Sequence, residues 1–334
     1  MGTIIITTVL GLLGMLMDIL KMRKAIVIIS SLVLIGLSVF NVVAYWGINA
    51  SYYSNMIVLD NFTVGFSSLL LLVSGLLIFL SNQFFEREEE KISDYVALFV
   101  FALVGALLMI SYGNLATLFI GIEILSISLY VLAASNRKSL ASNEAGMKYF
   151  LMGAFMTGFL LLGITLLYGV SGSFDVLEIQ TALMSKTSSP LLMTGVVLLV
   201  IAMLFKASVA PFHFWAPDVY TGSPTLVTGF MSTVAKVAAF GAMYKLFAVA
   251  LVPKIYEVEP LLIMFIILTF IIANFSALKQ TSVKRILAFS GVSHAGFLLL
   301  AIVSSNFESA GNLFYYAAAY AIANVVAFTV VIYV

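Results

Sequence analysis

One stretch, residues 190–224, limits most strictly what this chain can fold into. It reads PLLMTGVVLLVIAMLFKASVAPFHFWAPDVYTGSP. As one straight helix, its roughly 32 mostly apolar residues would extend about 48 Å, well beyond the roughly 30 Å hydrocarbon layer of a bilayer. Pro211 predicts that the helix breaks, because its ring clashes with the carbonyl of Ala207 and its missing N–H leaves that carbonyl without a donor. Lys206 directly precedes this point, and a cation beside unpaired backbone at membrane depth is tolerated only inside protein or against a wet cavity.

The composition is that of an all-α polytopic membrane protein. The 334 residues are 63% hydrophobic and 9% charged, with a mean hydropathy of +1.15, whereas soluble domains are about 25% charged. The net charge of +1 gives no nucleic-acid footprint. The absence of cysteine excludes iron–sulfur ligation, thiol catalysis and disulfides. No GxxxxGK[ST] motif occurs, so a partner or an ion gradient must supply the energy for any transport.

Apolar runs long enough to cross a bilayer predict about eleven transmembrane spans. They are 4–20, 25–46, 62–81, 95–112, 115–134, 147–170, 191–221, 225–251, 260–278, 286–305 and 312–334. Basic residues follow the first run instead of preceding it, which is opposite to a signal peptide and predicts an uncleaved span. The last run reaches Val334 without a polar flank, which predicts that the sequence is a fragment.

The basic residues of the connections predict the orientation. With the N-terminus outside, most of them fall in inner loops, as membrane proteins prefer. The inner set is Lys21, Arg23, Lys24, Arg87, Lys91, Arg137, Lys138, Lys148, Lys279, Lys284 and Arg285, and the outer set is Lys186, Lys245 and Lys254. The acidic segment 85–91 is predicted to be a solvated inner connection.

Three ionisable residues remain in the middle of spans: Glu123, Lys206 and Lys236. Each costs about 2.5–3.5 kcal/mol at the centre of an isolated helix. One carboxylate can neutralise only one ammonium group, and burial and a neighbouring cation both favour the neutral amine. We therefore expect a proton relay in which Glu123 modulates Lys206, and Lys206 exchanges protons with Lys236 through water. The alternative is a structural ion pair that only fixes helix packing.

The two histidines have different expected roles. His294, about nine residues into its span, could extend the relay. His213, beside the break, is better suited to a structural hydrogen bond. The two could together ligate one b-type haem, but each stands alone on its helix and the lysines would crowd the iron. We expect this chain to bind no cofactor and no metal.

Several motifs, in this order along the chain, resemble one family. They are GIEILSISLYVL, EAGMKYFLMGAF, KASVAPFHFWAPDVYTGSP, STVAKVAAF and ALKQTSVKRILAFSGVSHAGF. From about residue 60 to its end the chain resembles the antiporter-like subunits of respiratory complex I, a family shared with Mrp-type cation/proton antiporters. The PDVYTGSP ending is more similar to the subunit N branch than to the L and M branches, where a histidine-containing segment usually occupies that place.

The resemblance implies a fourteen-helix fold with two inverted five-helix repeats and a broken helix in each. Residues 1–94 would then hold helices 1–3, residues 95–251 the first repeat with its broken helix at 191–221, and residues 260–334 the start of a second repeat. It also implies that Glu123, Lys206 and Lys236 match the family's glutamate, broken-helix lysine and central lysine, with His294 on the axis that connects the repeats.

The function implied by the resemblance is proton translocation in the bacterial inner membrane by a subunit of NADH–quinone oxidoreductase. NADH and quinone would be used elsewhere in the complex, and the partners would be membrane lipid and neighbouring antiporter-like subunits. An Mrp-type cation/proton antiporter is the alternative, although two lysines are poor neighbours for a dehydrated sodium ion. A purely structural subunit is the third possibility.

Overall fold

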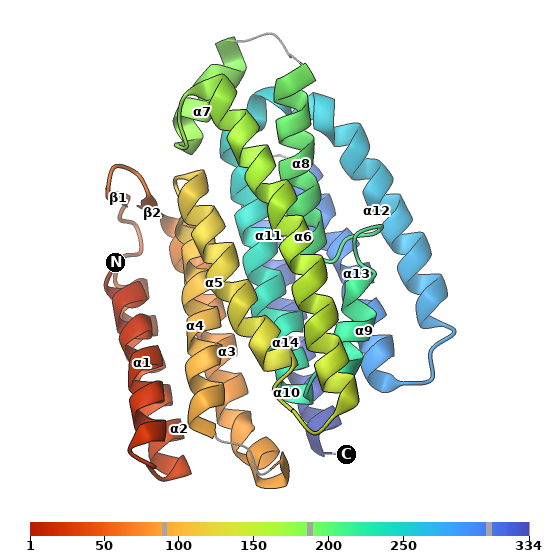
Figure 1. Ribbon diagram of the computed structural model, residues 1–334. Coiled ribbons are helices and arrows are strands. Elements are labelled where there is room, and N and C mark those ends of the chain that lie inside the picture. Colours follow the sequence, from red (N-terminus) through yellow and green to blue (C-terminus); the bar gives the residue numbers. More distant parts are fainter. Residues whose placement is uncertain (89–91, 186–189, 305–308, 334) are drawn as a thin grey trace.

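The computed structural model describes residues 1–88, 92–185, 190–304 and 309–333, and nearly all of them are helical (Figure 1). Three sequence predictions fall outside this part of the chain. They concern Lys91 at the end of the acidic 85–91 segment, Lys186 as an outer-loop cation, and the chain end at Val334. These stay predictions. For the described part of the 85–91 segment the predicted solvated connection is wrong, because residues 85–88 continue α3 and Phe85 is buried.

The helices and the short hairpin follow one another in a simple order. The N-terminal part comprises α1 (Gly2–Ile19), α2 (Lys24–Val43), β1 (Ala50–Tyr52), β2 (Ile57–Leu59), α3 (Asn61–Glu88), α4 (Ile92–Ser111), α5 (Leu115–Ala133), α6 (Leu140–Ser171) and α7 (Val176–Ser185). The remainder comprises α8 (Pro190–Lys206), α9 (Trp215–Gly222), α10 (Thr225–Phe230), η1 (Met231–Ala235), α11 (Lys236–Lys245), η2 (Leu246–Ala250), η3 (Val252–Lys254), α12 (Ile255–Ala277), α13 (Val283–Val303) and α14 (Ser309–Tyr333).

The predicted all-α polytopic fold is confirmed. Ten helical segments of the described residues are long and apolar enough to cross a membrane. The remaining predicted span, 191–221, is present as two shorter helices, α8 and α9, which are separated by a break.

The two ends of the bundle differ in character. The β1–β2 hairpin, at the upper left of Figure 1, and α7, at its top, lie at one end of the bundle, which we call the hairpin end. The connections α1–α2, α5–α6 and α12–α13 lie at the other end, which we call the basic end because it carries residues such as Lys21, Arg137, Lys138 and Lys279. The assignment of Lys245 to an outer loop is wrong: it is the last residue of α11, and it is buried. The reason is that the hairpin and α7 cover this end of the span.

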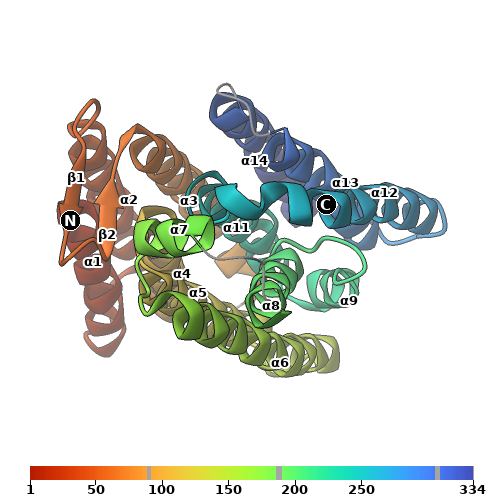
Figure 2. The ribbon, with the colours of Figure 1, turned by 90° about the horizontal axis from the view of Figure 1, so that it is seen from above.

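The segment Thr225–Ala250 is the centre of the bundle (Figure 2), and α11 contacts α3, α4, α8, α13 and α14. It is not one regular helix, because π-helical turns at Met231–Ala235 and Leu246–Ala250 flank α11. A π turn inserts an extra residue into the helical repeat and is frequent at functional sites. Lys236 directly follows the first π turn, and Lys245 directly precedes the second.

Close glycine contacts hold the helices that carry Glu123 and Lys206. A Cβ atom on Gly105 of α4 would lie 2.4 Å from the backbone nitrogen of Leu125 in α5. A Cβ on Gly163 of α6 would lie 2.8 Å from that of Leu199 in α8. Small residues let backbones approach in this way and increase packing between membrane helices. The α4–α5 contact fixes the helix segment that presents Glu123.

We expect Gly105→Ala to lower the free energy of unfolding by about 1–3 kcal/mol, the usual cost of forcing an extra methyl group into packed space. Thermal unfolding in detergent measures this change. Gly158→Ala in α6 is the matched control, because nothing lies within 4 Å of the added Cβ. An unchanged melting temperature for Gly105→Ala would contradict the close contact.

Candidate functional site

The break between α8 and α9 is longer than Pro211 alone predicts. Helix α8 ends at Lys206 and helical structure resumes only at Trp215. Ser208 has a positive φ of 59°, and the Ala210–Pro211 peptide bond is cis. Side chains satisfy part of the released backbone: the Ala210 N–H donates to Thr269 Oγ1 at 3.0 Å, and Trp215 Nε1 donates to the Phe205 carbonyl at 3.0 Å. The break is therefore a defined structure held by α12 and by the first residue of α9.

Glu123 and Lys206 lie near each other but are joined through hydroxyl groups. Lys206 Nζ donates to Ser126 Oγ at 2.7 Å, and Ser126 in turn donates to the Ile122 carbonyl. The Glu123 carboxylate accepts a hydrogen bond from Thr157 of α6 at 2.7 Å. Among the described residues, no direct ion pair joins Glu123 to Lys206. The carboxylate and the ammonium group are thus held on one face of α5 with room for the distance between them to change.

A small cleft of about 20 Å³ opens beside Lys206 and is lined by Ser126 and Thr157, among others. One water molecule needs about 10–15 Å³ on this measure, so the cleft has room for a single water molecule. Sequence reasoning missed both hydroxyl residues. The spacing of three between Glu123 and Ser126 on one helix could have indicated Ser126, because residues three apart share a helix face.

Lys206 also contacts an aromatic stack that includes the first residue of α9. Its Nζ lies 5.8 Å from the ring centroid of Tyr149 in α6. The Tyr149 ring stacks on Trp215 with a centroid distance of 4.7 Å and an interplanar angle of 8°. Trp215 therefore contacts both the Tyr149 ring, which lies beside the Lys206 ammonium group, and the Phe205 carbonyl. A shift of α9 would change the surroundings of Lys206.

Lys236 is the most deeply buried of the predicted relay residues, at 2% exposure. Its Nζ donates to the Gly291 carbonyl of α13 at 2.6 Å and lies 6.0 Å from the ring centroid of Tyr320 in α14. A Cβ on Gly291 would be only 3.4 Å from Nζ, so glycine leaves room for the ammonium group. A carbonyl oxygen solvates the charge but does not neutralise it.

The structure brings His294 into the same region. It lies three residues beyond Gly291 on α13, and its Nδ1 shares a 2.7 Å hydrogen bond with the Tyr316 hydroxyl. Its ring centroid is 5.1 Å from that of Tyr320. Sequence reasoning did not single out Tyr316 or Tyr320, although their spacing of four places them on one face of α14. His213 lies in the break, 6.4 Å from the ring of Phe289, and its buried Nδ1 has no hydrogen-bond partner among the described residues.

Two buried hydroxyl groups near the lysines lack a hydrogen-bond partner within the described part of the chain. They are Ser208 Oγ in the break and Tyr320 Oη beside Lys236. Buried polar groups in folded proteins nearly always have a partner, which is often an ordered water. Water could therefore bind at Ser208 Oγ, which lies near Lys206, and at Tyr320 Oη, which lies near Lys236.

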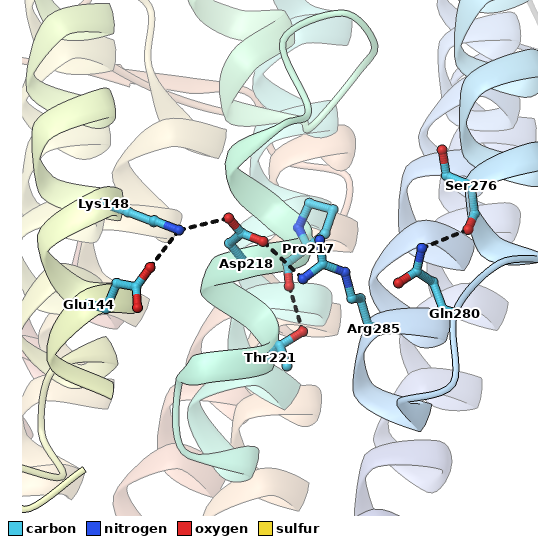
Figure 3. A network of polar contacts seen from close by, with 8 residues as sticks. All are labelled: Glu144, Lys148, Pro217, Asp218, Thr221, Ser276, Gln280 and Arg285. Carbon is cyan, nitrogen blue, oxygen red and sulfur yellow. Dashed lines mark hydrogen bonds and ion pairs between the residues drawn. The ribbon is translucent and has the colours of Figure 1, made fainter. Parts of the chain in front are cut away.

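Helix α9 is held at the basic end by charges from both of its neighbours (Figure 3). Asp218 accepts a hydrogen bond from Lys148 of α6 at 2.9 Å and pairs with Arg285 of α13 at 3.0 Å. Lys148 also pairs with Glu144 at 2.7 Å. We call Glu144, Lys148, Asp218 and Arg285 the α9 clamp. The sequence analysis placed Lys148 and Arg285 in loops, which is wrong, because Lys148 lies in the third turn of α6 and Arg285 in the first turn of α13.

Comparison with known proteins agrees with this geometry. The family described as NADH:quinone oxidoreductase/Mrp antiporter, TM, matches residues 112–334. NADH-quinone oxidoreductase subunit N of Flavobacterium psychrophilum is 48% identical over 334 residues, which is all of this chain and 73% of that protein. The chain belongs to the subunit N family. The resemblance found in its motifs is thereby confirmed.

Solved structures agree with membership of the subunit N family. A chain of respiratory complex I from Thermus thermophilus superposes with a TM-score of 0.84 at 30% identity, covering 98% of this chain and 70% of that one. A chain of the Mrp complex from Dietzia sp. superposes with a TM-score of 0.84 at 21% identity, covering 98% and 63%, and shares the fold. The redox chemistry of NADH-quinone oxidoreductase therefore belongs to other subunits, and this chain is a membrane subunit.

We expect Asp218→Asn to loosen α9, because it removes the charge that both Lys148 and Arg285 face while keeping the shape. Each pair is partly exposed and is worth about 0–1 kcal/mol, so we expect a loss of about 1 kcal/mol that becomes smaller at high salt. Thermal unfolding at low and high ionic strength measures it. Glu178→Gln on the exposed surface of α7 is the control and should change nothing; equal melting temperatures for both variants would contradict the clamp.

Proposed function

We propose that the chain translocates protons within NADH-quinone oxidoreductase, and that Glu123, Lys206, Lys236 and His294 carry them. The observation that carries the proposal is the environment of Lys236. A lysine that is almost fully buried donates to the Gly291 carbonyl, and Gly291 lies three residues before His294 on α13. Burial without a carboxylate favours release of the proton, and the imidazole is suited to accept it.

The first transfer step involves Glu123 and Lys206. When the carboxylate is close, it favours the ammonium form of Lys206, and when it moves away, the amine can release its proton. Because Thr157 holds Glu123 and Ser126 holds Lys206, the pair can separate without leaving either group unpartnered. The cleft beside Ser126 has room for the water molecule that such a step needs.

The second step carries the proton from Lys206 to Lys236. The helix break begins directly after Lys206. It leaves Ser208 Oγ buried and without a hydrogen-bond partner among the described residues. Tyr320 Oη is similarly placed beside Lys236. Water bound to these hydroxyl groups would bridge the two amines, and a proton that leaves one ammonium group would arrive on the neutral amine of the other.

The third step carries the proton from Lys236 to His294. The neutral imidazole accepts a proton on one ring nitrogen and can release one from the other. Tyr316 fixes the ring by its hydrogen bond to Nδ1. The result is a path that leaves the central helix sideways, through α13 and α14, in the direction of the second repeat.

We place the N-terminus and the hairpin end outside the bacterial inner membrane, so that the basic end faces the cytoplasm as membrane proteins prefer.

We also divide the chain into helices 1–3 at 1–94, a first repeat at 95–251 and the start of a second repeat at 260–334. NADH and quinone would react in other subunits, and neighbouring antiporter-like subunits would transmit the energy. A displacement of α9 against its clamp is one way in which that energy could reach Lys206.

We expect Lys206→Met and Lys206→Arg to fail alike in the complete complex, because arginine keeps the charge but cannot release a proton. Coupled proton pumping in proteoliposomes should fall at least tenfold, since a positioned proton-transfer group contributes about 10²–10⁴-fold. Lys138→Met, at an exposed site of the basic end, is the control and should pump normally. Full pumping by Lys206→Arg would show that Lys206 is only a structural charge.

We expect Tyr316→Phe to slow pumping several-fold while the complex still assembles, because the ring that packs on α13 stays and only the hydroxyl on His294 is lost. The initial rate of acidification per NADH oxidised measures the effect. Tyr315→Phe is the matched control, since Tyr315 is 78% exposed on the neighbouring position of α14. Identical rates for the two variants would remove Tyr316 from the path.

A further inference from the structure

A further buried lysine, Lys245, takes no part in the relay described above. It is 7% exposed, and its Nζ makes no hydrogen bond to any residue that the structure describes. Its nearest aromatic neighbour is Tyr112, whose ring centroid lies 5.5 Å from Nζ. An ammonium group over an aromatic face is attracted by the ring without exchanging a proton with it.

Lys245 and Lys236 lie at opposite ends of α11 and on opposite faces of it. Nine positions of an α-helix correspond to about 14 Å of rise and a half-integral number of turns, at about 3.6 residues each. The contacts agree with this, because Lys236 reaches α13 whereas Lys245 reaches Tyr112, which directly follows α4. Lys245 therefore lies between the central lysine and the hairpin end of the molecule.

The hairpin end is closed over Lys245 by several backbone contacts. Ile57 of β2 pairs with Tyr112, and the N–H of Gly113 donates to the Met56 carbonyl at 3.1 Å. Helix α7 packs against η2, which directly follows Lys245. Asp60, which caps α3 by accepting from the Thr63 N–H at 2.7 Å, is close enough for its carboxylate to act on the ammonium group through space.

The surroundings of Lys245 suit a fixed charge better than a proton carrier. The Tyr112 hydroxyl is already committed, since it donates to the Ala242 carbonyl at 3.0 Å. Within the described residues, no hydroxyl, imidazole or carboxylate is hydrogen-bonded to Nζ to pass a proton on. Lys236, in contrast, has His294 and Tyr320 at hand. A fixed cation in a low-dielectric passage excludes protons and other cations.

We propose that Lys245 is an electrostatic barrier that closes the hairpin end of the central helix to protons. This inference rests on the proposed function, because it assumes that Lys236 holds a proton in transit. With the route along α11 blocked by a like charge, the proton on Lys236 leaves sideways to His294. The barrier keeps the first repeat from discharging the proton gradient through its own outer end.

Passive proton leak through the complete complex tests the barrier. The complex is reconstituted in liposomes without NADH, a potassium diffusion potential is imposed with valinomycin, and internal acidification is followed with a pH-sensitive dye. Lys245→Met, which removes the charge and keeps the volume, should raise the leak at least tenfold, equivalent to about 1.4 kcal/mol of barrier. Lys245→Arg should stay at the wild-type level, because arginine keeps a permanent charge.

Lys254→Met is the matched control, since Lys254 lies near the same end and pairs with Glu257 at 3.1 Å; its leak should be that of the wild type. If Lys245→Met does not assemble, Lys245→Gln replaces it, with the same expected leak. An unchanged leak in an assembled neutral variant would overturn the barrier. The barrier would also be overturned by a Lys245→Arg complex that keeps the wild-type proton leak but has lost pumping, because that result would make Lys245 a proton carrier.

These outcomes are independent of the relay. The leak is measured without turnover, whereas the relay is judged by NADH-driven pumping in the Lys206 variants. Full pumping by Lys206→Arg with a raised leak in Lys245→Met would remove the relay and keep the barrier. The reverse pattern would remove the barrier alone.

Discussion

The central constraint on this structure is that several lysine ammonium groups are buried without a carboxylate hydrogen-bonded to each, so other groups must solvate their charge. Lys206 donates to a serine, Lys236 donates to a backbone carbonyl, and Lys245 lies over a tyrosine ring. Each of these contacts tolerates the charge but does not neutralise it. The cost must be offset by helix packing, which the close contacts at Gly105 and Gly163 provide. Lys206 and Lys236, which lie beside hydroxyl or imidazole groups that can pass a proton on, would change protonation state more readily than amines in ion pairs, as the proposed relay requires.

The broken helix connects these charges to the rest of the molecule. Helix α8 brings Lys206 to α5, while α9 is a separate short element held through Trp215 and Asp218, both of which lie in its first turn. A continuous helix could not move one half against the other. In the proposed function, a displacement of α9 by its neighbours α6 and α13 would reach the Phe205 carbonyl, beside Lys206, through Trp215.

Sequence reasoning identified the relay candidates but not their immediate partners. Glu123, Lys206 and Lys236 were found because charges at span centres are costly and therefore rare. Ser126, Thr157 and Tyr316 were missed because hydroxyl residues are common in membrane helices and carry no such cost. Lys245 was misplaced because a lysine near the end of an apolar run usually reaches the interface, and the run itself does not reveal that a hairpin and α7 cover it.

The sequence by itself determined the membrane class, the order of the spans, the position of the broken helix and the family, because apolar length, proline and motif order are local properties. The tertiary structure alone decided which groups touch: Lys236 with Gly291 and Tyr320, Asp218 with Lys148 and Arg285, and Lys245 with Tyr112. The physical reason is that these contacts join residues up to 133 positions apart in the sequence. Their geometry depends on how helices cross and on two π turns, which no local pattern specifies.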